Sequence, residues 1–175
     1  AIYDTLTEGS LTEGDSVAGT GTIAADGTVL EPVTVQDLER LAADLEKLDV
    51  AAVAVSFLNA YRNPCHEQQV AAFLRKRFPS AYLCTGTELS REWFEYERSS
   101  TAIANAFVGP RAATYLQRLA QALRDRAFRG RLFIMSSNGG VLSVPQARQE
   151  PLALVESGPV GGSIGAAVYA RALGI

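Results

Sequence analysis

The stretch with the most evident chemical potential is LVESGPVGGSIGAAVYA, residues 154–170, where glycines separate an apolar segment from an alanine-rich one. Gly161, Ser163 and Gly165 satisfy the G-x-S-x-G pattern of the nucleophile elbow, in which a serine attacks an acyl carbon. Such a serine needs a base, and in that fold the histidine follows the serine along the chain. The only histidine is His66, far upstream, so the sequence argues against a serine hydrolase.

The same glycines do not fit a dinucleotide-binding fingerprint. That motif places glycines at i, i+2 and i+5, whereas this chain has Gly158, Gly161, Gly162 and Gly165. What remains is a turn that lets another group approach the backbone closely, followed by free amide groups at the start of a helix expected over 162–174. The residues alone leave open whether that group is a ligand or a neighbouring strand.

Two further groups have residue types that could bind a ligand. Asn138, Gly139 and Gly140 follow a predicted strand, at the edge where open α/β sheets bind ligands, but Asn-Gly is equally typical of a plain turn. Glu97 and Arg98 could anchor a substrate carboxylate or phosphate, or could form a structural ion pair or helix cap. The sequence alone allows both a ligand site and a structural role for each of these two groups.

The sequence predicts no metal site. His66 and Cys65 are adjacent in the first turn of a predicted helix, but no second histidine or cysteine stands at ligand spacing. His66 is therefore expected on the surface or in a capping role.

Alternating helices and strands must position these candidates. Asp26-Gly27, between two short β-prone runs, predicts a hairpin. Thr34 and Asp37 form a capping pair ahead of apolar residues at helical spacing, which predicts a helix near 35–48. The remaining expected elements are buried strands at VAAVAVSFL and RLFIM, strands at AYLCT and LALV, a helix from Pro64 to Pro79, helical sequence from Trp93 to Phe128 interrupted at Gly109 and Pro110, and a sharp turn at SSNGG.

This order predicts an α/β fold, a three-layer sandwich with a mostly parallel sheet. Residues 1–16 are expected to be a poorly anchored lead-in and residues 17–175 a single α/β domain. The first residue is alanine rather than methionine, so we expect the chain to be part of a longer protein.

The composition argues against several classes of function. The 175 residues are 47% hydrophobic and 20% charged, with a formal net charge of −3, as in a soluble globular protein with no whole-domain attraction to nucleic acid or anionic membrane. The longest apolar run is far shorter than the roughly 20 residues of a membrane helix. Two cysteines without CxxC spacing favour a reducing compartment, so a cytoplasmic protein is expected.

Five stretches together resemble the amino-terminal part of the hydantoinase A/5-oxoprolinase family. They are AADGTVLEPV, VAVSFLNAYRNPCHEQQVAAFLRKRFP, EYERSSTAIANAFVGP, GRLFIMSSNGGVLS and LVESGPVGGSIGA, in the family's order from about residue 20 to the end. MSSNGG and SGPVGG are the most specific pieces. Acetone and acetophenone carboxylase subunits belong to the same wider group, and these motifs do not separate them.

The resemblance implies one lobe of the actin-like ATPase, ribonuclease H-like, fold. In that superfamily two related domains close over ATP and magnesium, each opening with a phosphate loop, and this sequence contains neither loop. The chain would then form the body of one lobe, with helix 162–174 resembling the helix that connects the domains. Asn138, Gly139, Gly140, Ser157, Gly158, Gly161 and Gly162 are the residues expected near the nucleotide or the interdomain cleft.

The implied activity is ATP-dependent opening of hydantoin or 5-oxoproline-type cyclic amides, by phosphorylation of the carbonyl oxygen followed by water attack. ATP and Mg²⁺ are expected in the full-length enzyme and no cofactor in this chain alone, which is expected to be inactive. Expected partners are the remainder of the hydantoinase A chain, a hydantoinase B-type subunit and a small cyclic amide substrate. The alternatives are a non-catalytic interaction domain, or part of a related ATP-dependent ketone carboxylase subunit.

Overall fold

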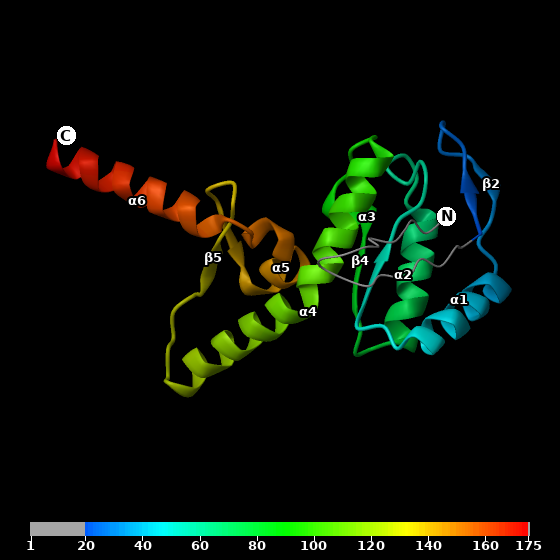
Figure 1. Cartoon of the computed structure of the whole chain (residues 1–175), viewed down its shortest axis with the longest axis horizontal. Coiled ribbons are helices and arrows are strands. Elements are labelled where there is room, and N and C mark those ends of the chain that lie inside the picture. Colours follow the sequence, from blue (N-terminus) through cyan, green and yellow to red (C-terminus); the bar gives the residue numbers. More distant parts are fainter. Residues whose placement is uncertain (1–19, 175) are drawn as a thin grey trace. The chain divides into compact units, whose positions relative to one another are not determined.

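The structure is a computed structural model that describes residues 20–174 (Figure 1). The expected lead-in, residues 1–16, lies outside the described residues. The part predicted as a single domain divides into two compact units, one ending at Pro110 and the other beginning at Arg111.

The first unit opens with the predicted β-hairpin. Strands β1 (Thr22–Ile23) and β2 (Val29–Glu31) pair antiparallel around a turn in which Gly27 has a φ of +94°. Asp26 Oδ1 accepts a hydrogen bond of 2.8 Å from the Thr28 amide, and this bond lowers the pKa of Asp26. The Asp-Gly signal therefore predicted the hairpin correctly.

Helix α1 (Val35–Leu48) has the predicted bounds because both of its sequence signals are realised. Thr34 and Asp37 cap each other: the Asp37 amide donates to Thr34 Oγ1 at 3.2 Å, and the Thr34 amide donates to Asp37 Oδ2 at 3.0 Å. The Thr34 hydroxyl also donates to Asp37 Oδ2 at 2.6 Å, and this bond is the main cause that lowers the pKa of Asp37 to about 2. The apolar stripe Leu38, Leu41 and Leu45 is buried.

A β-α-β unit forms the centre of this part of the chain. Strand β3 (Ala52–Val55) pairs in parallel with β4 (Tyr82–Thr85), and helix α2 (Cys65–Arg77) connects and packs against both strands. Helix α1 packs on α2. The apolar core is made by Val33, Leu38, Leu41, Leu45, Val53, Val55, Phe57, Ala60, Val70 and Leu74. The strands and helix predicted for this region are confirmed.

After the short helix α3 (Gly86–Leu89) comes α4 (Glu95–Asp125), which is one continuous helix. The interruption predicted at Gly109 and Pro110 is wrong. Proline fixes φ near the helical value, so a helix can continue through it at the cost of one hydrogen bond and a local bend. The boundary between the two units falls at this proline.

The second unit differs most from the prediction. RLFIM forms strand β5 (Phe133–Met135), but it pairs antiparallel with β6 (Val141–Ser143) and is only partly buried. LALV is not a strand; it forms a 3₁₀ helix, η1 (Pro151–Leu154), preceded by α5 (Val144–Gln149), and the last helix is α6 (Ser157–Leu173). Short apolar runs do not distinguish strand from helix by periodicity, which explains the error at LALV.

The fold class is α/β, but the sheet is not mostly parallel. The described residues form three two-stranded sheets, of which only β3–β4 is parallel. Among residues 20–174, no helix combines the length and the apolar character required to cross a bilayer.

Candidate functional site

Parallel strands β3 and β4 end at the same edge, where polar side chains converge on Phe57. Glu67, fully buried on α2, accepts from the Phe57 amide through Oε1 at 3.0 Å. Its Oε2 accepts from the Thr87 amide at 2.8 Å and from Thr87 Oγ1 at 2.6 Å. One carboxylate thus joins the segments that follow the two strands.

Arg98, near the start of α4, binds the carbonyl group of the same residue. It is 0% exposed, and its Nη2 donates to the Phe57 carbonyl at 2.7 Å and to the Glu95 carboxylate, while Nη1 donates to the Glu92 carbonyl at 3.0 Å. Arg98 therefore pairs with Glu95, whereas Glu97 is exposed on the helix surface.

Gly86 lies where these two charged side chains meet. A Cβ built there would lie 3.2 Å from Arg98 Cγ and 3.3 Å from Glu67 Oε1, closer than most neighbours of a real Cβ. Glu67 accepts hydrogen bonds from the Phe57 amide and from Thr87, and both Arg98 terminal nitrogens donate to groups of the chain itself. Among the described residues, Arg98 Nε has no hydrogen-bond partner. Burial and these bonds fit a structural role for Arg98 better than contact with a substrate.

In the second unit, Asn138, Gly139 and Gly140 form the tip of the β5–β6 hairpin. Asn138 Oδ1 accepts from the Gly140 amide at 2.9 Å and from Ser136 Oγ at 3.0 Å, and Gly139 has a φ of +86°. The Ser137 amide donates to the Ala153 carbonyl at 2.7 Å, which ties the turn to η1. The predicted sharp turn is confirmed, with a conformation that favours glycine at 139.

The structure brings this turn and α6 together. A Cβ at Gly139 would lie 3.2 Å from Ile164 Cδ1, and one at Gly161 would lie 3.6 Å from Met135 Cγ. The glycine-rich stretch is therefore not the expected turn: it lies inside α6, which begins at Ser157 rather than at 162, and Gly161 packs on the chain's own hairpin.

Ser157, Gly158 and Gly162 do not show the same closeness. Gly158 and Gly162 have no heavy atom within 4 Å of a built Cβ, and Ser157 is half-buried at the helix start. Nothing among the described residues explains why these two positions are glycine.

An acidic side chain lies at the start of α6. The residue before it, Glu156, has a φ of +64° and makes no side-chain capping bond. Its carboxylate complements the helix dipole but would repel a phosphate placed there. Within residues 20–174, no three or more His, Cys, Asp or Glu side chains lie close enough to share a metal ion.

His66 is not at the surface, so that prediction is wrong. Its side chain is buried, with the ring centroid 5.5 Å from that of Phe57, and its Nδ1 has no hydrogen-bond partner within residues 20–174. Burial lowers the pKa of His66, since the charged imidazolium loses water.

Strand β3 and helix α2 lie in one of two regions that match a single family, and the glycine hairpin and α6 lie in the other. Residues 1–78 match the N-terminal region of the hydantoinase/oxoprolinase family. Residues 98–175 match the region described simply as hydantoinase/oxoprolinase. The chain belongs to the hydantoinase/oxoprolinase family.

Particular relatives come from several organisms. An uncharacterized protein of Methanocaldococcus jannaschii is 32% identical over 86% of this chain and 22% of its own length. Caprolactamase subunit alpha of Pseudomonas jessenii is 28% identical over 89% of the chain and 22% of its own. The acetone carboxylase beta subunit of Xanthobacter autotrophicus is 24% identical over 85% of the chain and 21% of its own.

Solved structures agree with these relationships. The crystal structure of ATP-dependent caprolactamase from Pseudomonas jessenii superposes with a TM-score of 0.78 over 89% of this chain and 22% of that one. Nucleotide-free acetone carboxylase gives a TM-score of 0.74 at 24% identity, over 88% of this chain and 22% of that one, and so shares the fold. This chain spans about a fifth of the length of the relatives that it matches.

Proposed function

We propose that this chain is part of an ATP-dependent hydrolase that opens small cyclic amides such as lactams, hydantoins or 5-oxoproline. The observation that carries the proposal is the similarity to caprolactamase, 28% identical with a TM-score of 0.78 over 89% of the chain. In the proposed reaction, the γ-phosphoryl group moves from ATP to the ring carbonyl oxygen and ADP leaves. Water then adds to the activated carbon, and the ring C–N bond breaks to free the amine and leave an acyl phosphate. A second water attacks the carbon of the acyl phosphate and displaces phosphate, which carries the former carbonyl oxygen. ATP and Mg²⁺ are part of this proposal for the whole protein.

Within that enzyme, residues 20–174 serve as framework, and the actin-like lobe expected from the resemblance is part of the same proposal. The Glu67 and Arg98 side chains fix the loop ends at the β3–β4 edge, and the hairpin at Gly139 positions the first turns of α6. Such positioning is the main contribution of a protein scaffold to phosphoryl transfer.

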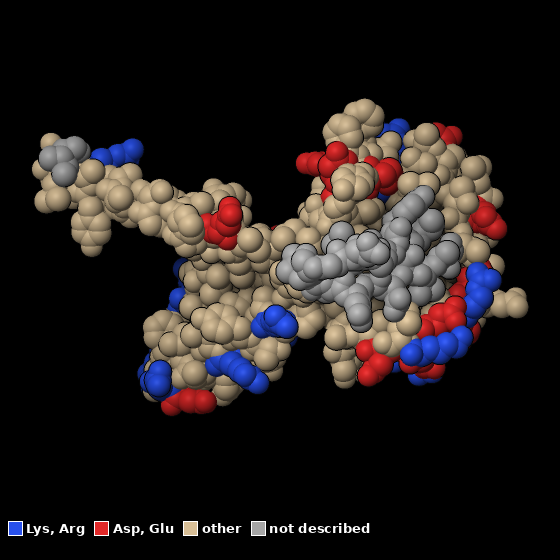
Figure 2. Space-filling view, in the orientation of Figure 1, with Lys and Arg blue, Asp and Glu red and all other residues tan. Residues whose placement is uncertain are grey.

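Helix α6 is where we place the contact with the rest of the protein. Arg171 is its only charged residue, none of its side chains is buried, and Figure 2 shows a largely uncharged surface along it. Val168, Tyr169 and Leu173 are between 59% and 73% exposed, an apolar surface that single soluble domains rarely leave uncovered. A B-type partner subunit is proposed as well, since caprolactamase and acetone carboxylase relatives are named as subunits.

A ketone carboxylase is the second candidate, because acetone carboxylase shares the fold with a TM-score of 0.74. A non-catalytic interaction domain is the third, and α6 would then be its binding surface. The cytoplasm is the proposed location of the protein in each case.

A substrate panel with the product of the complete gene, purified with any co-purifying subunit, separates these candidates. We expect phosphate release from ATP that depends on ε-caprolactam, hydantoin or 5-oxoproline and yields the ring-opened acid by mass spectrometry. Phosphate release that requires a ketone and bicarbonate would favour the carboxylase. No stimulation by any of them would contradict both enzyme proposals.

A further inference from the structure

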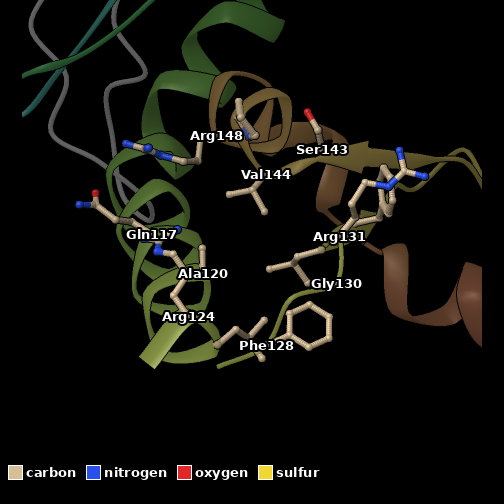
Figure 3. Close-up of a pocket in the computed structure, with 13 residues that line it drawn as sticks. Gln117, Ala120, Arg124, Phe128, Gly130, Arg131, Ser143, Val144 and Arg148 are labelled. Atoms are coloured by element: carbon tan, nitrogen blue, oxygen red, sulfur yellow. The ribbon is translucent and has the colours of Figure 1, made fainter. Parts of the chain in front are cut away.

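The unit that begins at Arg111 contains a cavity of about 560 Å³, within the roughly 300–1,000 Å³ of small-molecule sites. Figure 3 shows it between α4, the loop that leads into β5, and α5. None of its lining residues belongs to the Ser136–Gly140 turn or to α6. The cavity is therefore separate from the positions considered above.

Apolar side chains form much of the cavity wall. Leu123, Leu132 and Val144 line it together with Phe128 and Phe133, whose rings are 48% and 47% exposed. A ligand with an apolar body would remove these surfaces from water, and burial of such surface is favourable by roughly 25 cal/mol per Å².

The shape of the loop holds the Phe128 ring in the wall. A Cβ at Gly130 would lie 2.4 Å from Phe128 Cζ, so the ring packs where only glycine leaves room. The preceding Ala127 has a φ of +58°, a conformation that costs an alanine about 1 kcal/mol and more. The Phe128 amide donates to the Leu123 carbonyl at 3.0 Å, which anchors the loop to the end of α4.

The charged residues of the cavity have one sign. Arg124, Arg131 and Arg148 line it, and none of its lining residues is Asp or Glu. Arg124 donates to Gln121 Oε1 at 2.6 Å, and the Arg131 guanidinium lies 5.4 Å from the Phe133 ring centroid. Residues 111–175 contain eight arginines and three acidic residues, so the field of this unit favours anions.

We infer that this cavity binds a small organic anion, with an apolar body between the leucine and phenylalanine side chains and a carboxylate beside Arg124 and Arg148. Guanidinium groups bind carboxylates through paired, charge-assisted hydrogen bonds, and the aromatic rings suit a flat or branched hydrocarbon body. This inference does not depend on the proposed function, since it concerns a separate cavity.

Three probes titrated into the 175-residue chain test both parts of the ligand. 1-Naphthoate carries the carboxylate and the apolar body, 1-naphthalenemethanol lacks the charge, and acetate lacks the body. Titration followed by amide chemical shifts should show saturable binding of 1-naphthoate, with the largest shifts at Gly130, Val144 and Arg148. Loss of one charge-assisted pair corresponds to about tenfold in affinity, so both other probes should bind at least about tenfold more weakly.

Variants identify the arginines involved. Arg124→Met and Arg148→Met keep the aliphatic stem and should each weaken 1-naphthoate binding by about tenfold. Arg118→Met, on the exposed surface of α4 and not among the lining residues, is the matched control and should bind like the unchanged chain. Equal binding of the neutral alcohol, an equal loss in Arg118→Met, or no shifts at lining residues would overturn the inference.

Discussion

Glu67 and Arg98 both hold the backbone of Phe57: the carboxylate accepts from its amide at 3.0 Å, and the guanidinium donates to its carbonyl at 2.7 Å. Both charged side chains are fully buried. The backbone of Phe57 cannot rearrange without breaking a charge-assisted hydrogen bond, either at its amide or at its carbonyl. The end of β3 is therefore one of the best-defined points of the first unit.

Replacing Glu67 by Gln should destabilise the first unit by about 2–3 kcal/mol. The glutamine amide has one acceptor oxygen, so its NH₂ group must face either the Phe57 amide or the Thr87 donors, and one donor loses its partner. Urea unfolding followed by Trp93 fluorescence measures this change, since Trp93 is the only tryptophan. Glu39→Gln, exposed on α1, is the control and should stay within about 0.5 kcal/mol. Equal stability of both variants would contradict this account of Glu67.

Arg98→Met should lower the stability of the isolated chain by about 2–3 kcal/mol, because the Phe57 and Glu92 carbonyls lose their donor and Glu95 loses its ion-pair partner. The same unfolding experiment measures it. Arg91→Met, exposed just before α4, is the control. A variant that melts like the unchanged chain, yet loses activity in the complete protein, would instead assign Arg98 to substrate binding.

Two glycine-to-alanine substitutions should have opposite effects. A Cβ at Gly109 would lie 2.4 Å from Tyr82 Cε1, so Gly109→Ala should force the ring aside and cost about 1–3 kcal/mol. Gly162 has open space and lies inside α6, so Gly162→Ala should stabilise that helix by about 0.5–1 kcal/mol. Thermal unfolding followed by circular dichroism checks both, and a destabilising Gly162→Ala would show a contact that the described structure lacks.

Lowering the pH below about 6.5 should reduce the stability of the folded chain because of His66. Burial lowers the pKa of His66 in the folded chain below its usual 6.5, so the unfolded chain binds more protons as the pH drops below 6.5. The stabilisation is thus fully present above about pH 6.5 and is lost toward the lowered folded pKa. Unfolding free energies at pH 7.5 and 5.5 should differ more in the unchanged chain than in His66→Gln. As the chain has one histidine, parallel pH dependences would contradict this explanation.

The first unit could be predicted from sequence because its signals are local. The Thr34–Asp37 cap and the apolar spacing fixed the bounds of α1, and the run at β3 lacks alternation, as is typical of parallel strands. The Glu95–Arg98 ion pair also has a local sequence signal, because residues three apart lie on the same face of a helix. The prediction instead paired Arg98 with the adjacent Glu97.

Non-local features could not be predicted in this way. Glu67 contacts Phe57 and Thr87, which lie 10 and 20 residues away, and no spacing rule connects them. In the second unit, the Asn-Gly pair flanked by β-prone residues did predict a turn, but the strand Val141–Ser143 that follows it was missed. The family resemblance, by contrast, depended on motif order and is confirmed over both matched regions.

An isotope-transfer measurement tests the proposed function most directly. The complete gene product is incubated with ATP, Mg²⁺ and a lactam carrying ¹⁸O in its carbonyl, and the released phosphate is analysed by mass spectrometry. If the carbonyl oxygen is phosphorylated before ring opening, the phosphate gains one ¹⁸O atom. Unlabelled phosphate, with all of the ¹⁸O retained in the ring-opened acid, would contradict the account.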